Sequence, residues 1–224
     1  MKRINRGALA LAMLAVTATA ALAATVNGVT NGDFETGNTN GWTYSCPASG
    51  GATTGILGAT DLVIDSGSTW GYLNDQAQAA VDCDLYQDVT IPASATAATL
   101  TMRYALTGSN AADGTETRRI DVTTPAGVVL VNIQPSVNRG TTRAFAPLGA
   151  PVNLTAYAGQ TVRIRARTSN PANSGSANAI GIDDVVLNIT TPNPVPTLSE
   201  WAMILFGLVL AGGAALMVQR RRFV

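Results

Sequence analysis

Apolar and polar residues alternate along several short stretches of the chain between residues 25 and 190. The alternation is strict at 100–106, and it recurs at 120–122, 128–133 and 162–167. A period of two with one apolar face is typical of a half-buried β-strand. No stretch of this region combines a 3.6-residue apolar period with helix caps. Many short strands between turns rich in Gly, Ser, Asn and Thr predict an all-β sandwich or jelly roll.

A long apolar segment near the C-terminus departs from this pattern. Residues 202–218 carry no charge, and as a helix they would span about 26 Å, close to the ~30 Å hydrocarbon core of a bilayer. Trp201 stands at one end and Arg220–Arg222 at the other, as expected for an interfacial aromatic and a cytoplasmic basic end. The segment predicts a single transmembrane helix at 202–219 with a basic cytoplasmic tail at 220–224. The alternative is a buried helix of a soluble domain.

The N-terminus has the three parts of a secretory signal peptide. Its first residues are basic, namely Lys2, Arg3 and Arg6. A short apolar stretch follows at 8–16, and Ala21-Leu22-Ala23 fits a small-x-small cleavage site. We predict a signal peptide at 1–23 and a mature chain that starts at Ala24. An uncleaved anchor is the weaker alternative, because the apolar stretch is short and rich in alanine.

These segments leave one exported domain at 24–191 and a linker with a short motif at 192–201. The domain contains eight arginines and thirteen acidic residues, so its net charge of about −5 argues against a nucleic-acid-binding surface. The chain has no histidine, and Lys2 is its only lysine. A Ser-His-Asp triad, a histidine metal site, a Schiff-base lysine and a P-loop are therefore excluded. Hydrolysis by carboxylates alone stays open.

The two cysteines of the chain are Cys46 and Cys83. An even pair in an exported domain predicts a disulfide, and two free thiols are the alternative. In the chain-entropy model, closing this loop of about 37 residues would stabilise the fold by ~4 kcal/mol. Asp82, Asp84 and Asp88 surround Cys83, and we expect a solvated loop there rather than an acid–base pair.

The motif before the apolar segment is Val195-Pro196-Thr197-Leu198-Ser199-Glu200-Trp201. Together with the helix and the arginines, it resembles the IPTL-type C-terminal sorting signal of Gram-negative bacteria, a relative of the PEP-type signals. The chain departs from the usual pattern at Val195, where isoleucine is common, and at Ala202, where glycine is common. The resemblance implies recognition by an exosortase-like membrane transpeptidase, cleavage near the motif and transfer to the cell surface. The helix would then be a temporary anchor in the inner membrane.

Four further motifs occur in order through the exported domain. They are Val29–Gly37 followed by Gly41-Trp42, Leu85–Pro92, Ala156–Arg165 and Gly181–Leu187. This succession resembles the galactose-binding-like jelly rolls of carbohydrate-binding modules and bacterial surface proteins. The resemblance covers nearly the whole domain, and its motifs are more specific for the fold than for a ligand.

The same resemblance implies a structural calcium ion between the first and last strands. Glu35 and Asp184 match the positions of its ligands, and Asp33 and Asp183 are weaker candidates. Calcium prefers six to eight hard oxygens, which carboxylates and backbone carbonyls supply. The alternative is that Asp184 accepts backbone N–H bonds or pairs with an arginine without a metal. Asp183 and Asp184 are adjacent, so one of them should face inward or lie at a bulge.

Sugar binding would require aromatic faces beside polar groups. Trp70 and Tyr72 follow a loop-like run and are the better candidates, whereas Trp42 more often packs in the core of related domains. Arg163, Arg165 and Arg167 alternate on one predicted strand, so they should share a face at spacings of about 6.5–7 Å. They could bind an anionic polysaccharide through bidentate contacts. The alternative is a solvated sheet face with acidic neighbours, such as Glu116 or Asp121, across the strands.

We therefore expect a non-enzymatic, surface-sorted structural or adhesive protein whose jelly-roll domain contacts extracellular polysaccharide. A calcium-dependent, lectin-like carbohydrate-binding module is the first alternative. A carboxylate-dependent hydrolase is the second.

Overall fold

The structure is a computed structural model, and it describes nine segments of the chain. They are residues 23–36, 40–45, 54–55, 71–74, 81–108, 117–137, 144–170, 178–192 and 198–221. Two compact units are present. Ala23–Pro192 forms one, and the C-terminal helix belongs to the other.

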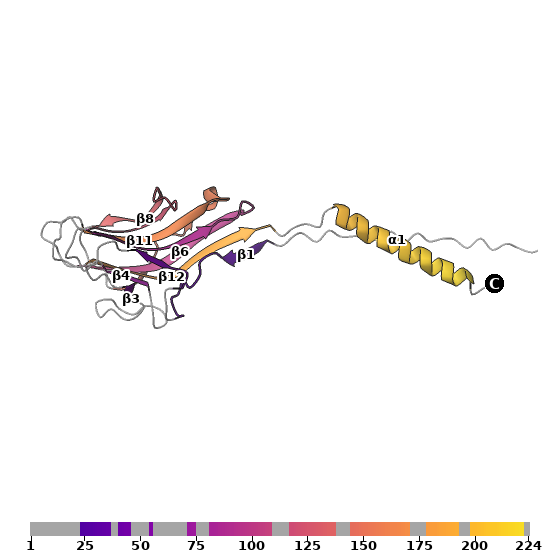
Figure 1. The fold of residues 1–224 in the computed structure, drawn as a ribbon, viewed down its shortest axis with the longest axis horizontal. Helices are drawn as coiled ribbons and strands as arrows, with labels where there is room; N and C mark the ends of the chain where they lie inside the picture. The colour runs from indigo at the N-terminus through magenta and orange to yellow at the C-terminus, as the bar shows by residue number, and fades with distance from the viewer. Residues whose placement is uncertain are drawn as a thin grey trace, which may run out of the picture. The chain divides into compact units, whose positions relative to one another are not determined.

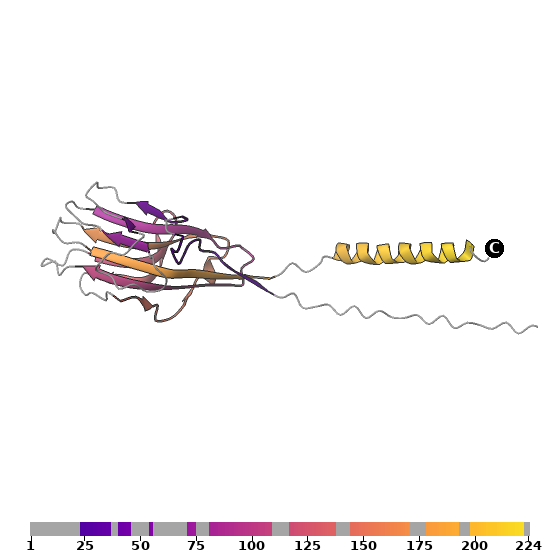
Figure 2. The ribbon, with the colours of Figure 1, turned by 90° about the horizontal axis from the view of Figure 1, so that it is seen from below.

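The first unit is built from two antiparallel sheets, which Figures 1 and 2 show as stacked layers. The first sheet contains β1 (Ala24–Asn27), β3 (Thr54–Gly55), β4 (Gly71–Asn74), β6 (Ala97–Gly108), β9 (Ala146–Pro147), β10 (Val152–Asn153) and β12 (Asn178–Thr191). Its strand order is β10-β6-β12-β4-β3, with β1 also paired to β12 and β9 to β6. The long strand β12 therefore pairs with three neighbours.

The second sheet contains β2 (Thr43–Ser45), β5 (Val81–Thr90), β7 (Thr117–Thr123), β8 (Val129–Val137) and β11 (Thr161–Asn170). Its order is β2-β5-β11-β7-β8, and a short 3-10 helix, η1 (Thr155–Tyr157), precedes β11. These two sheets confirm the predicted all-β sandwich.

The core lies between the sheets, and the predicted alternation determines which side chains enter it. On β11, Val162, Ile164 and Ala166 are buried in the core, and the residues between them face away from it. Phe34 and Trp42 also belong to the core, with ring centroids 5.1 Å apart. Trp42 is therefore a core residue, as the resemblance to jelly-roll domains implied.

Residues 27–32 fasten the N-terminal segment to β12, and we call this contact the N-terminal clasp. The Gly28 amide donates to the Leu187 carbonyl at 2.8 Å, and the Val185 amide donates to the Gly32 carbonyl at 2.9 Å. At Gly32 the backbones are so close that a Cβ atom would stand 2.0 Å from the Val185 oxygen. The clasp therefore requires glycine at this position.

Strand β12 is irregular next to the clasp. Its register against β6 shifts between Asp183 and Val186, and Asp184 has a left-handed φ of 49°. Asp183 is completely buried. The adjacent aspartates thus occupy a bulge with one carboxylate inside, as predicted.

In the second unit, α1 (Leu198–Arg221) is a single helix. Its segment Trp201–Gln219 has a mean hydropathy of 2.2 and is long and apolar enough to cross a membrane, by length and composition. The helix begins at Leu198, so the last four residues of the motif are helical. The proposed signal peptide lies outside the described residues, except for Ala23, and stays a prediction.

Candidate functional site

The face of β11 that points away from the core carries arginines at three successive alternate positions, 163, 165 and 167. The neighbouring strands place an aspartate directly opposite each one. The register pairs are Arg163↔Asp88 and Arg167↔Asp84 with β5, and Arg165↔Asp121 with β7. We call these six residues the arginine–aspartate ladder.

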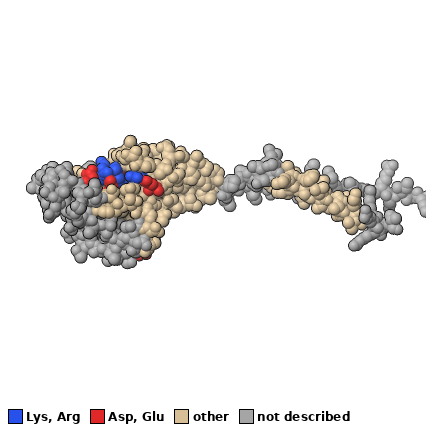
Figure 3. Space-filling model, in the orientation of Figure 1, with Lys and Arg blue, Asp and Glu red and all other residues tan. Residues whose placement is uncertain are grey.

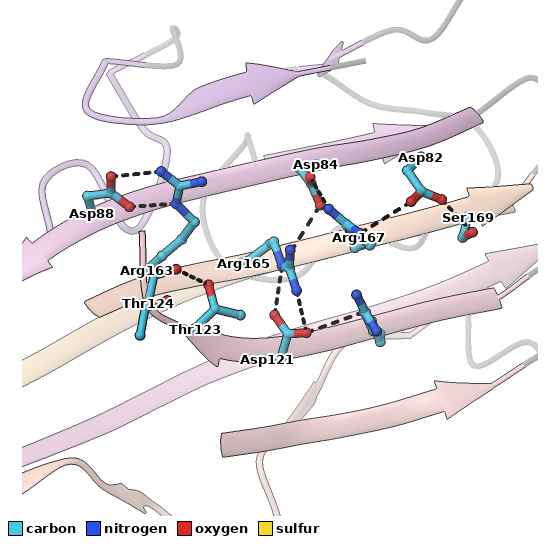
Figure 4. Close-up of polar contacts among 11 residues, drawn as sticks. Asp82, Asp84, Asp88, Asp121, Thr123, Thr124, Arg163, Arg165, Arg167 and Ser169 are labelled. Atoms are coloured by element: carbon cyan, nitrogen blue, oxygen red, sulfur yellow. Dashed lines mark hydrogen bonds and ion pairs between the residues drawn. The ribbon is translucent and has the colours of Figure 1, made fainter. Parts of the chain in front are cut away.

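Each ladder pair is bidentate, with the guanidinium donating two parallel hydrogen bonds to the carboxylate (Figure 4). The Nε–Oδ1 and Nη2–Oδ2 distances are 2.7 and 2.9 Å for Arg163–Asp88, 2.8 and 2.8 Å for Arg165–Asp121, and 2.6 and 2.6 Å for Arg167–Asp84. This geometry is the strongest form of an arginine–carboxylate contact. The ladder therefore holds its guanidinium planes in fixed orientations.

Further polar contacts extend the ladder at one end. Arg167 Nη1 donates to Asp82 Oδ2 at 3.3 Å, and the Ser169 hydroxyl donates to Asp82 Oδ1 at 2.5 Å. At the other end, the Arg163 guanidinium lies over the Tyr86 ring, 3.7 Å from its centroid. Arg163 is therefore held both by a cation–π contact with Tyr86 and by its hydrogen bonds to Asp88.

Burial differs along the ladder. Arg165 and Asp121 are 4% and 0% exposed, whereas the Arg163 and Asp88 side chains are 19% and 37% exposed. Figure 3 shows basic and acidic residues side by side on this face of the sandwich. Hydrogen bonding to Asp88 raises the pKa of Arg163 above its ordinary value, and hydrogen bonding to Asp84 does the same for Arg167. Both arginines therefore stay charged at any physiological pH.

These contacts identify the neighbours of the three predicted arginines. Asp121 faces Arg165, as the alternative of acidic neighbours across the strands expected, but this pair is buried and not solvated. Glu116 lies outside the described residues. The prediction of a solvated loop at Asp82, Asp84 and Asp88 was wrong. These aspartates alternate with core residues along β5 because that segment is a strand. The Asp-Cys-Asp-Leu alternation was the signal that could have revealed it.

A second cluster of polar groups lines a pocket of about 300 Å³ beside the clasp. Its walls are Asn27, Val29, Asn31, Gly32, Asp33, Asp184, Val185 and Val186. Asp33 and Asp184 thus share one pocket, although the sequence places them 151 residues apart. The Asp33 carboxylate accepts from the Glu35 amide at 3.3 Å.

Of the four predicted calcium ligands, the pocket brings together Asp33 and Asp184. Glu35 and Asp183 are not among its lining residues, and the Asp183 carboxylate accepts from the Asp184 amide at 2.8 Å. Across the described segments there is no group of three or more His, Cys, Asp and Glu that could hold a metal. The two carboxylates are hard donors of the kind calcium prefers, whereas Asn31 Oδ1 accepts a hydrogen bond from the Thr36 hydroxyl at 2.8 Å. They fit the ion in part, and calcium binding stays a prediction.

Other predicted residues are only partly covered by the structure. Tyr72 belongs to β4, where it pairs with Gly181. Cys83 is fully buried in β5, and its disulfide stays a prediction because its expected partner is not described. Leu198, Trp201, Arg220 and Arg221 lie in α1. The residues outside the described segments are Cys46, Trp70, Val195, Pro196, Thr197 and Arg222.

Comparison with known families bears directly on the tail. A family model described as the IPTL-CTERM motif matches residues 193–222. This match confirms the resemblance to a sorting signal, and with the apolar helix it fits a membrane-anchored precursor for surface sorting. No curated protein matches the chain.

Solved structures resemble the sandwich at low sequence identity. The carbohydrate-binding module TmCBM61, in complex with β-1,4-galactotriose, has 14% identity and a TM-score of 0.48, over 72% of this chain and 97% of its own. The enzymatically active domain of a bacteriophage CBA120 tailspike protein has 17% identity and a TM-score of 0.45, over 73% of this chain and 21% of its own. A cleaved adhesin domain of Lys-gingipain from Porphyromonas gingivalis has 14% identity and a TM-score of 0.43, over 77% of this chain and 99% of its own. At these sequence identities and TM-scores, the ligands and activities of these proteins say nothing about those of this chain.

Proposed function

We propose that the chain is an exported protein of a Gram-negative bacterium that is sorted to the cell surface by an exosortase-like enzyme. The β-sandwich is the displayed part, with a structural or adhesive role in contact with extracellular polysaccharide. The observation that carries this proposal is the IPTL-CTERM match at 193–222, a segment that contains the apolar helix and the basic residues.

A non-enzymatic role agrees with the chemistry of the ladder. Hydrolysis by carboxylates needs one carboxyl group that donates a proton and a second that acts as base or nucleophile. Asp84, Asp88 and Asp121 each accept two hydrogen bonds from an arginine. These carboxylate oxygens are already engaged by guanidinium groups, an arrangement that suits a structural role of the sheet face.

The mature C-terminus tests the sorting proposal. Mass spectrometry of surface material should find chains that end near Pro196-Thr197, whereas recovery only of chains that end at Val224 would refute processing. We expect Pro196→Ala, and deletion of Arg220–Arg222, to leave the precursor in the membrane. The matched control replaces the three arginines by lysines, which keeps the positive charge and should keep sorting.

A calcium-dependent, lectin-like module is the second candidate, and the Asp33–Asp184 pocket favours it. A glycan array on residues 24–192 with calcium separates the two. Binding that disappears in EDTA supports the lectin, and an array without signal supports the structural protein. Release of reducing ends from a matrix polysaccharide would instead support a hydrolase.

A further inference from the structure

The chemistry of the exported domain restricts how a sorting enzyme can join it to other molecules. A transpeptidase cleaves the peptide bond at its signal and transfers the carbonyl to an acceptor nucleophile. For a covalent polymer of one protein, every copy must also supply an acceptor, and transfer of an acyl group to an amine gives a stable amide bond. Residues 24–224 contain no lysine. After signal-peptide removal, the α-amine of Ala24 is therefore the only primary amine of the chain.

The structure places that amine at the edge of the folded sandwich. Ala24 is the first residue of β1 and pairs directly with Thr191, the last residue of β12. The hydroxyl groups of Thr25 and Thr190 are 2.9 Å apart in the next pair. With the predicted cleavage after Ala23, the mature chain would begin at β1, so its α-amine would lie at the end of the sheet. It also lies beside the strand from which its own tail departs, as β1 and β12 in Figure 1 show.

The segment that would supply the acyl group, between β12 and α1, is short. Only six residues, 192–197, separate Thr191 from the start of α1, and fully extended they reach about 20 Å. Joining the tail of one copy to Ala24 of the next would bring the same ends of two sandwiches within this distance. The joined segment would also have to run beside the β1–β12 ribbon of the acceptor copy.

We propose, resting on the sorting function above, that the protein acts only as an acyl donor and is attached to the surface at a single point. In this reaction the peptide bond at the cleavage site breaks, and a new bond joins its carbonyl carbon to a hydroxyl or amine of a different molecule. The proton of that acceptor passes to the amine of the departing tail. Copies of the sandwich are not joined to one another by amide bonds, because the side chains of residues 24–197 offer no amine and Ala24 stays free.

Dimethyl labelling of amines on sorted material, followed by digestion and mass spectrometry, tests this inference with the full-length chain as expressed. We expect one labelled amine per chain, on Ala24, and a C-terminal peptide that carries an acceptor other than this protein. A peptide that joins the tail to Ala24 of another copy, or of the same chain, would overturn the inference. Labels on Met1 and Lys2 would overturn it as well, since the signal peptide would then remain.

A matched variant controls the detection. Ala126 is exposed in the turn between β7 and β8, so Ala126→Lys should add one labelled amine per chain without disturbing the core. This variant shows that a free amine on the sandwich is labelled in full. Chains that end at Val224 would refute sorting itself, and that outcome is distinct from a linked Ala24.

Discussion

Arg165 and Asp121 form a bidentate ion pair that is almost fully removed from solvent, although both side chains point away from the core. Both hydrogen bonds are 2.8 Å long, and the residues are 4% and 0% exposed. Arg119 approaches the same carboxylate, with Nε 3.3 Å from Asp121 Oδ2. The outer face of the second sheet thus contains a buried charge pair within a row of more exposed ones.

Breaking this buried pair should cost far more than breaking an exposed one. Asp121→Asn removes the bidentate carboxylate partner of a buried guanidinium, so we expect it to lower the free energy of unfolding by about 3–5 kcal/mol. Arg165→Met should cost less, because Arg119 still pairs with Asp121. Urea denaturation of residues 24–192 measures the loss. Replacing both residues at once should recover much of the loss, because the charge that remains is on Arg119, whose side chain is 32% exposed.

The Arg163–Asp88 pair is the control, with the same geometry and greater exposure. Here the single replacements Arg163→Met and Asp88→Asn should cost about 0.2–1 kcal/mol, and the cost should shrink in high salt. Equal losses at the two positions would contradict the assignment of burial as the deciding factor.

The ladder also illustrates what the sequence could and could not predict. The alternation at 162–167 predicts a strand with its arginines on one face, and the structure confirms it. The alternation does not identify the neighbouring strands. It determines which face of the sheet each side chain occupies, but not which strand pairs with β11. The carboxylates of Asp84 and Asp121 come from positions 83 and 44 residues away from their arginines. The same holds for the pocket, where Asp33 and Asp184 meet only because the clasp returns the first segment to β12.

Gly32 should be among the residues least tolerant of substitution. A Cβ atom there would stand 2.0 Å from the Val185 carbonyl oxygen, which cannot move without breaking the clasp. We expect Gly32→Ala to destabilise the domain by about 1–3 kcal/mol or more. Hydrogen exchange should accelerate at the Val185 amide, which donates to Gly32.

Gly149→Ala is the matched control for that substitution. Nothing lies within 4 Å of the Cβ position at Gly149, so its stability change should stay within about 0.5 kcal/mol. Similar losses for the two alanine variants would contradict the close approach to Val185 as the cause.

Tyr44 makes the domain sensitive to alkaline pH. Its hydroxyl is buried without a hydrogen-bond partner in the described part of the chain, and burial raises its pKa above the ordinary value of 10.0. The folded state then holds the phenolic proton more tightly than the unfolded state. This contribution is complete below about pH 10 and is lost as the pH rises through the folded-state pKa.

Tyr44→Phe should therefore flatten the loss of stability between about pH 9 and pH 11, as followed by urea midpoints. At neutral pH the variant should be as stable as the native domain or slightly more so, since it removes an unpaired buried hydroxyl. Tyr86→Phe is the control, because it keeps the ring under Arg163. A pH profile of Tyr44→Phe that matches the native one would contradict this role.

The Asp33–Asp184 pocket predicts which carboxylates a calcium ion would use. We expect calcium to raise the melting temperature of residues 24–192 and EDTA to reverse the rise, because a ligand that binds only the folded state stabilises it. The gain would be about 2.7 kcal/mol at a free calcium concentration of about 100 times the dissociation constant. An identical melting temperature in calcium and in EDTA would rule out the ion.

Variants then separate the ligand set of the pocket from that of the sequence resemblance. Asp33→Asn and Asp184→Asn should each abolish the calcium response, and asparagine tolerates the left-handed φ of 49° at position 184. Glu35→Gln should leave the response intact if the pocket residues bind the ion, because Glu35 is not part of the pocket lining. A response that is lost in Glu35→Gln and kept in Asp33→Asn would instead favour the ligands that the resemblance implies. Calorimetric titration of calcium into the three variants distinguishes these results, since it measures binding apart from any change in the stability of the apo domain.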